Sequence, residues 1–198
     1  MDFPTPAQPA GSIWIMGLSS SGKSTLAELL VARLRSEGYP CLLLDGDQIR
    51  TVFEERLGYD PESRRKQTAR VLRLARLIAK QGILPVVAII HSVEADREMC
   101  RNAMPGYFEV WLKCALDVCV GRDTKNVYRP ALDGKAANVV GLDIPYEEPR
   151  HADIVLDSGT TTPGMMLERL WGAIETPLLT HGPWGARVRA QAMGVAAK

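Results

Sequence analysis

A chain of 198 residues with 46% hydrophobic and 24% charged residues has the size and composition of one globular domain with a real core. Its formal net charge of +1 argues against a surface dedicated to nucleic acid, and no stretch approaches the roughly eighteen apolar residues of a membrane span. We therefore expect neither nucleic acid nor a membrane as a partner. Residues 1–10 are rich in proline and lack the features of a secretory signal, and the four cysteines form no C-x-x-C pair. These features favour reduced thiols and a cytoplasmic location.

Expected strands and helices alternate along the chain. Continuous apolar runs predict buried strands, and apolar residues at helical spacing predict helices. The expected strands cover residues 12–16, 41–44, 83–90, 107–112 and 153–156, and the expected helices cover 24–34, 63–81, 95–103, 115–120 and 165–174. This alternation predicts an α/β fold with a mainly parallel central sheet and right-handed crossovers.

Residues 17–24 read GLSSSGKS and match the phosphate-loop pattern G-x-x-x-x-G-K-[ST]. Glycines let the backbone wrap around phosphates with its N–H groups turned inward, and the start of the following helix attracts anions. Lys23 can reach the outer phosphates, and the Ser24 hydroxyl can coordinate Mg²⁺. The strand before the loop and the helix after it predict a three-layer P-loop NTP-binding fold that uses ATP and Mg²⁺. The expected ATP-binding residues are Gly17, Ser19, Ser20, Ser21, Gly22, Lys23, Ser24, Thr25 and Arg122.

An acidic residue beside the phosphates is needed to place Mg²⁺ or to accept a proton. The strand at 83–90 is followed by His91 and Ser92, and no carboxylate comes before Glu94. The acid must therefore be Asp45 or Asp47 after the second strand. Because the carboxyl ends of parallel strands face one crevice, this pair is expected to look toward the phosphate loop. An ordinary turn with Asp47 as a helix N-cap is the alternative interpretation.

Residues 122–150 contain much glycine, proline and charge with little periodicity. An aperiodic stretch of this length in a compact domain is usually functional. A small phosphotransferase needs a lid that excludes water, since otherwise ATP is hydrolysed. We expect a lid here, with Arg122 and Lys125 stabilising charge on the transferred group.

Together these residues resemble the adenylylsulfate kinase family across about residues 13–159. The matching strings are the phosphate loop through Thr25, Leu44-Asp45-Gly46-Asp47 with Arg50, Leu57-Gly58-Tyr59 with Arg64, Arg122-Asp123-x-Lys125-x-x-Tyr128, and Gly141-Leu142-Asp143-x-Pro145-Tyr146-Glu147-x-Pro149. The resemblance implies transfer of the γ-phosphoryl group of ATP to the 3′-hydroxyl of adenosine 5′-phosphosulfate, in sulfate assimilation, by a Mg²⁺-dependent homodimer.

The resemblance also assigns roles to individual residues. It makes Asp47 the base and Asp45 a helper near Mg²⁺, so that Ser24 and Asp45 are the expected metal ligands. Arg50 and Arg64 are expected to bind the phosphosulfate, Tyr59 to lie near the base of the acceptor, and Lys125 to act from the lid. The expected catalytic residues are Lys23, Asp45, Asp47 and Lys125, and the expected acceptor-binding residues are Asp47, Arg50, Tyr59, Arg64, Gln67, His91, Lys125 and Val139.

Departures from the family pattern lie on the acceptor side. His91 replaces a serine, Gln67 replaces an asparagine, and Val139 replaces a phenylalanine that stacks on adenine. Cytidine-diphosphoramidate kinases, which resemble this chain at Asn138-Val139-Val140-Gly141, supply an alternative acceptor. A nucleotide-binding module without catalysis is a second alternative. A lone histidine at a strand end, as His91 is, is more often structural than in contact with a substrate.

The expected organisation is a proline-rich extension at 1–11, a kinase domain at 12–175 and a tail at 176–198.

Overall fold

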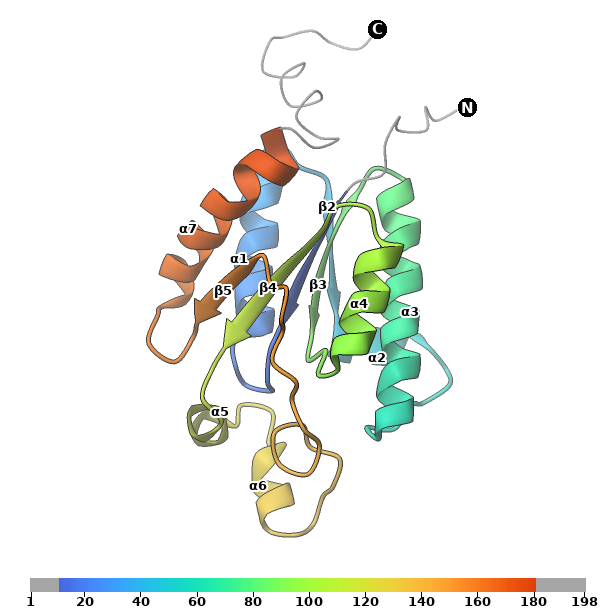
Figure 1. The fold of residues 1–198 in the computed structure, drawn as a ribbon, viewed down its shortest axis with the longest axis vertical. Helices are drawn as coiled ribbons and strands as arrows, with labels where there is room; N and C mark the ends of the chain where they lie inside the picture. Colours follow the sequence, from blue (N-terminus) through green and yellow to red (C-terminus); the bar gives the residue numbers. More distant parts are fainter. Residues whose placement is uncertain (1–10, 181–198) are drawn as a thin grey trace, which may run out of the picture.

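The computed structural model describes residues 11–180, which form a parallel sheet with helices on both faces (Figure 1). The strands are β1 (Ser12–Met16), β2 (Cys41–Asp45), β3 (Leu84–Ile89), β4 (Tyr107–Lys113) and β5 (Ile154–Asp157). The helices are α1 (Lys23–Ser36), α2 (Gly46–Val52), α3 (Pro61–Lys80), α4 (Glu94–Ala103), α5 (Leu116–Arg122), α6 (Tyr128–Leu132) and α7 (Pro163–Ile174), and the π-helix η1 (Glu175–Thr180) follows α7. The expected α/β fold with a parallel sheet is confirmed.

The strand order in the described sheet is β2-β3-β1-β4-β5, and every pair is parallel. Strand β1 lies in the centre, with Ile13 opposite Val86 on one side and Phe108 on the other. All five residues of β1 are fully buried because helices cover both faces of the sheet. This burial explains why the run preceding the phosphate loop is almost continuously apolar.

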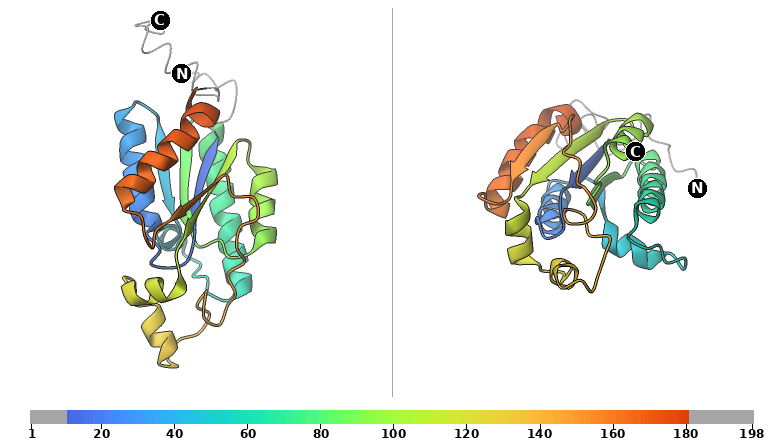
Figure 2. Two further views of the ribbon diagram at one scale, coloured as in Figure 1. Left: turned by 60° about the vertical axis from the view of Figure 1, so that its left-hand side comes forward. Right: turned by 60° about the horizontal axis from the view of Figure 1, so that its bottom comes forward.

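Helices α1 and α7 cover one face of the sheet, and α3 and α4 cover the other (Figures 1 and 2). Helix α3 begins two residues before the expected start at 63, because the Asp60 carboxylate accepts a hydrogen bond from the Ser63 N–H and Pro61 suits the first turn. Its buried stripe includes Val71 and Ala75, which pack on the sheet. The carboxyl ends of the strands therefore share one edge, where the phosphate loop also lies.

Helices α5 and α6 lie beyond this edge, at the bottom of Figure 1. Helix α6 falls inside the stretch predicted to be aperiodic, and its five residues are too few to give a helical pattern. A second small core of buried side chains holds this region to the phosphate loop: Leu18, Cys119, Tyr128, Val139 and Val140. The stretch expected to form a lid is therefore packed on the loop that it was expected to cover.

The termini were expected to form a proline-rich extension and a tail. Residues 1–10 and 181–198 lie outside the described residues, while 175–180 continue α7 as η1. None of the described helices is long and apolar enough to cross a membrane.

Candidate active site

The phosphate loop connects β1 to α1 with a backbone that requires glycine. Gly17 has φ 153°, and a Cβ there would lie 2.5 Å from the Leu112 carbonyl oxygen. Gly22 has φ 94° directly before α1. The close approach at Gly17 and the left-handed backbone at Gly22 explain why the motif has glycine at these two positions.

Lys23 lies at the start of α1 and is buried, with its Nζ donating to the Leu18 carbonyl oxygen at 2.5 Å. Burial, reinforced by the nearby Lys125 ammonium and opposed by Asp47 and Asp45, lowers the pKa of Lys23 from 10.5 to about 8. In the protein without nucleotide, the lysine is thus poised to lose its proton just above neutral pH. A bound triphosphate would favour the charged form.

This shift predicts proton uptake on nucleotide binding. At pH values just above 8 part of Lys23 is neutral, so binding of ATP should take up a proton, and affinity should fall as the pH rises through about 8. Calorimetric titration of ATP in two buffers of different ionisation enthalpy measures this uptake. In the variant Lys23→Met, proton uptake on ATP binding should be smaller than in the wild type, by the share that Lys23 contributes. Equal uptake by the wild type and this variant would contradict the assignment.

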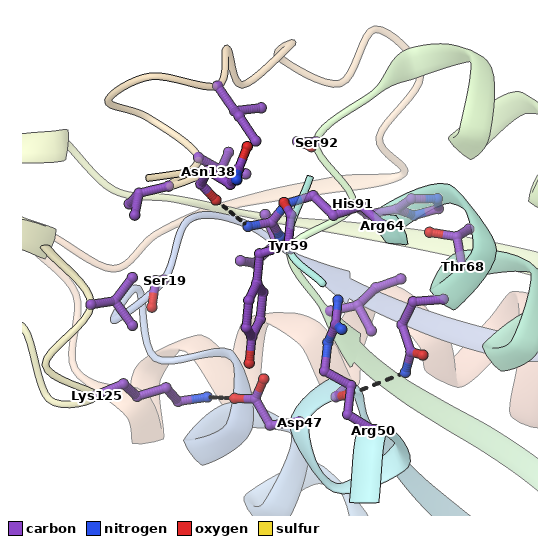
Figure 3. Close-up of a pocket in the computed structure, with 18 of the residues that line it drawn as sticks. Ser19, Asp47, Arg50, Tyr59, Arg64, Thr68, His91, Ser92, Lys125 and Asn138 are labelled. Atoms are coloured by element: carbon purple, nitrogen blue, oxygen red, sulfur yellow. Dashed lines mark hydrogen bonds and ion pairs between the residues drawn. The ribbon is translucent and has the colours of Figure 1, made fainter. Parts of the chain in front are cut away.

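Asp45 ends β2 and serves as the N-cap of α2. Its carboxylate accepts the Asp47 N–H at 2.9 Å and the Ser24 hydroxyl at 2.6 Å. The alternative interpretation of Asp47 as the helix cap is therefore wrong, since Asp45 fills that position. Asp45 is buried beside the phosphate loop, and Asp47, two residues further, projects into the cavity (Figure 3).

The Asp47 carboxylate meets Lys125 from the segment between α5 and α6, with Nζ and Oδ2 at 2.5 Å (Figure 3). Burial opposes charge on Lys125, but the contact with Asp47 outweighs it and raises the pKa of the lysine. Residues 78 positions apart in the chain thus meet over the entrance to the phosphate loop.

Asp123 and Tyr128 hold this segment in place. The Asp123 carboxylate accepts hydrogen bonds from the N–H groups of Val127, Tyr128 and Arg129 at the start of α6. The Tyr128 hydroxyl donates to the Ser19 carbonyl oxygen of the phosphate loop at 3.2 Å. Neither residue was among the candidates from sequence, although both occur in the Arg122-to-Tyr128 string. An aspartate shortly before a short helix was the available signal.

Elsewhere in the cavity lining, the exposed ring of Tyr59 lies close to two arginines, with the guanidinium carbons of Arg50 and Arg64 at 4.5 Å and 5.6 Å from its centroid. Arg50 donates to the carbonyl oxygens of Leu57 and Gly58. Arg64 donates to those of Tyr59 and Asn138. Burial, reinforced by the charge of Arg50, lowers the pKa of Arg64. These partners are uncharged carbonyl groups, so both guanidinium charges remain available to an anion.

Two further acceptor-side candidates have unpaired polar atoms within the described structure. Gln67 is buried with Nε2 3.5 Å from the Gly46 carbonyl oxygen, and its Oε1 has no partner. His91 follows β3 with φ 51°, and neither ring nitrogen has a partner. Burial and the charge of Arg97 lower the pKa of His91 to about 3, which keeps the imidazole neutral.

One cavity of about 480 Å³ brings most of the candidates together. Those that line it are Ser19, Lys23, Ser24, Asp45, Asp47, Arg50, Tyr59, Arg64, Gln67, His91, Lys125 and Val139. The structure does not place the remaining candidates on its lining: Gly17, Ser20, Ser21, Gly22, Thr25 and Arg122. Arg122 donates to the Ser158 carbonyl oxygen, and Thr25 is exposed on α1.

Comparison with known proteins decides the family. The family model described as Adenylylsulphate kinase matches residues 10–157. The chain belongs to the adenylylsulphate kinase family. A probable adenylyl-sulfate kinase of Bacillus subtilis is 39% identical over 149 residues, which cover 74% of this chain and 76% of that protein. A probable adenylyl-sulfate kinase of Archaeoglobus fulgidus is 38% identical over 146 residues, covering 74% of this chain and 94% of that protein.

Solved structures of adenylylsulphate kinases agree with the fold. The APS kinase CysC of Mycobacterium tuberculosis, in complex with AMPPNP and APS, superposes with a TM-score of 0.81 at 29% identity and covers 85% of this chain and 99% of its own. Shikimate kinase from Aquifex aeolicus has a TM-score of 0.52 at 17% identity, with 83% of this chain and 96% of that chain covered. The second likeness concerns the fold alone, which is the P-loop kinase fold.

Proposed function

We propose that this protein transfers the γ-phosphoryl group of ATP to the 3′-hydroxyl of adenosine 5′-phosphosulfate. The observation that carries the proposal is a single cavity in which Asp47 and Lys125 lie between the phosphate loop and the Arg50–Arg64 pair. Relatives of 38–39% identity named adenylyl-sulfate kinase support this choice of acceptor.

The donor half binds ATP through the phosphate loop. Backbone N–H groups of the loop surround the phosphates, and Lys23 moves from the Leu18 carbonyl oxygen to the β- and γ-phosphates. Lys125 approaches the γ-phosphoryl group from the opposite side and compensates its charge in the transition state. Ser24 and Asp45, whose side chains lie 2.6 Å apart at the end of the loop, are an oxygen donor pair suited to Mg²⁺. When bound there, Mg²⁺ would neutralise phosphate charge.

The transfer itself needs a base near the acceptor hydroxyl. Asp47 accepts the proton of the acceptor's 3′-hydroxyl while the oxygen of that hydroxyl bonds to the γ-phosphorus. The bond from the γ-phosphorus to the β–γ bridging oxygen breaks, which releases ADP. The contact between Lys125 and Asp47 supports this assignment, because both residues line the cavity that the phosphate loop and the Arg50–Arg64 pair also line. Positioning and charge compensation supply most of the rate in reactions of this class.

The acceptor half binds an anion beside an aromatic ring. Arg50 and Arg64 each retain N–H donors beyond their carbonyl contacts, and these suit the phosphosulfate. Tyr59 offers its ring to the adenine base, while the buried Val139 replaces a second ring with a small apolar surface.

Release of ADP with matched concentrations of three acceptors tests the function. Adenosine 5′-phosphosulfate should give a rate at least about tenfold above the acceptor-free background. Adenosine 5′-monophosphate should not, because it lacks the sulfuryl part of the phosphosulfate that is proposed to bind the two arginines. A faster release of ADP with cytidine diphosphoramidate than with adenosine 5′-phosphosulfate would show that cytidine diphosphoramidate is the better acceptor. Tight ATP binding without turnover for any of these acceptors would instead support a non-catalytic module.

The working unit is proposed to be a cytoplasmic homodimer with its kinase domain at 12–175. Sedimentation equilibrium of the purified chain tests the dimer.

A further inference from the structure

The wall of the acceptor side is formed by a segment without regular helix or strand. Residues 136–149 follow α6, and Asn138, Val139, Val140 and Ile144 of this segment line the cavity. The Asp143 carboxylate accepts the N–H groups of Asn138 and Val139, which folds the first part of the segment on itself. Such a wall needs anchors to the rest of the fold, since no strand or helix pairing fixes its place.

Arg97 of α4 provides an anchor behind this wall. Its side chain is 1% exposed and does not line the cavity. It donates to the His91 carbonyl oxygen at 2.6 Å, to Glu94 Oε2 at 2.9 and 2.6 Å, and to the Glu147 carbonyl oxygen at 2.8 Å. One planar guanidinium thus joins the turn after β3, the start of α4 and the wall segment.

Two backbone contacts complete the same junction. The Glu147 N–H donates to the Ser92 carbonyl oxygen at 2.9 Å, and the Glu94 N–H donates to Glu147 Oε2 at 2.7 Å. The junction also includes the left-handed backbone of His91, at φ 51°. A residue other than glycine persists in this conformation only when its surroundings hold it, and such residues cluster at functional sites.

We propose that Arg97 is a positioning residue for the acceptor: it fixes the turn at His91–Ser92 against the wall segment, and so sets the shape of the acceptor side without touching either substrate. The proposal rests on the proposed function. The hydrogen-bond partners of Arg97 are His91, Glu94 and Glu147, which lie outside the phosphate loop, so its effect should fall on the acceptor and spare ATP.

The variant Arg97→Lys tests this assignment. A lysine keeps the charge beside Glu94, but its ammonium lacks the planar fork that reaches three separate acceptors. We expect the KM for adenosine 5′-phosphosulfate to rise about tenfold and the KM for ATP to stay within about twofold, which is a loss of about 1.4 kcal/mol confined to one substrate.

Arg101→Lys is the matched control. Arg101 lies one turn further along α4 and donates to Oε2 of the fully buried Glu109 at 2.6 Å and to the His151 carbonyl oxygen at 2.8 Å. It has no contact with the turn after β3, so its variant should leave both KM values within about twofold.

Glu147→Ala, at an exposed position, removes the side-chain contact with the Glu94 N–H and should raise the acceptor KM about threefold without threatening folding.

Hydrogen exchange separates this proposal from the proposed function. Amides of residues 138–149 should exchange faster in Arg97→Lys and Glu147→Ala than in the wild type, whatever the acceptor. If the wild type fails to phosphorylate adenosine 5′-phosphosulfate, the proposed function is wrong and the exchange data still decide the role of Arg97. Unchanged exchange in this segment, or equal increases in both KM values, would overturn the assignment.

Discussion

Asp47→Asn is expected to lower kcat by about a hundredfold or more while leaving ATP binding nearly unchanged. The amide keeps the size of the side chain but cannot accept the proton of the attacking hydroxyl. The Asp45 contacts that cap α2 use the backbone N–H of residue 47 and survive the change. Single-turnover kinetics with saturating acceptor, together with ATP titration, measure the two effects separately.

Asp133→Asn is a suitable control, because Asp133 is an exposed acid at the end of α6 that pairs with Lys135. Its kcat should remain within about twofold of the wild type, as for most exposed ion pairs. Near-normal turnover by Asp47→Asn would show that Asp47 is not the base and would leave Asp45 as the candidate.

Lys23→Ala should lower kcat/KM for ATP by about a hundredfold to a thousandfold, the range seen when one preorganised charge donor is removed. The lysine is the buried cation of the phosphate loop, and Lys125 approaches from the opposite side of the cavity and cannot take its place. Initial rates at varied ATP give the measurement.

Folding must be checked separately for this variant. Because the folded protein holds Lys23 with a pKa of about 8, well below its value of 10.5 in an unfolded chain, the buried charge opposes folding at neutral pH. This destabilising contribution fades as the pH rises from about 8 toward 10.5, where the folded state has already lost the proton. Lys23→Ala should therefore unfold at an equal or higher temperature than the wild type at pH 7. A folded variant with unimpaired kcat/KM would contradict the role of Lys23.

The donor side could be predicted because its signals are local. The phosphate loop, its strand and its helix occupy consecutive residues. The left-handed backbone at Gly22 is one that glycine adopts readily, so the residue type itself indicates it. Parallel strands followed from alternating apolar runs, since each run needs helices on both faces. The ends of the expected elements differed by a few residues at most, as with α3 and its Asp60 cap, whereas the short helices α2 and α6 were not among the expected ranges.

The acceptor side depends on contacts between distant residues, which one sequence does not display. Whether Asp45 or Asp47 caps α2 was decided by the geometry at the end of β2. Arg97 belongs to no motif in the sequence, yet it is buried and joins segments 50 residues apart. The left-handed conformation of His91 had no sequence signal, because it is imposed by the junction around it.

The small core shared by Leu18, Tyr128 and Val139 has a consequence for the start and the end of each catalytic cycle. If the segment expected to form a lid moved away from the phosphate loop, these side chains would become exposed to water. Exposing one large apolar side chain costs about 1.5–3 kcal/mol. This packing therefore favours the conformation in which the segment lies against the phosphate loop, even before any substrate binds. Entry of ATP and escape of spent ADP would both have to work against that preference, so this packing would slow departure of the product as well as capture of ATP.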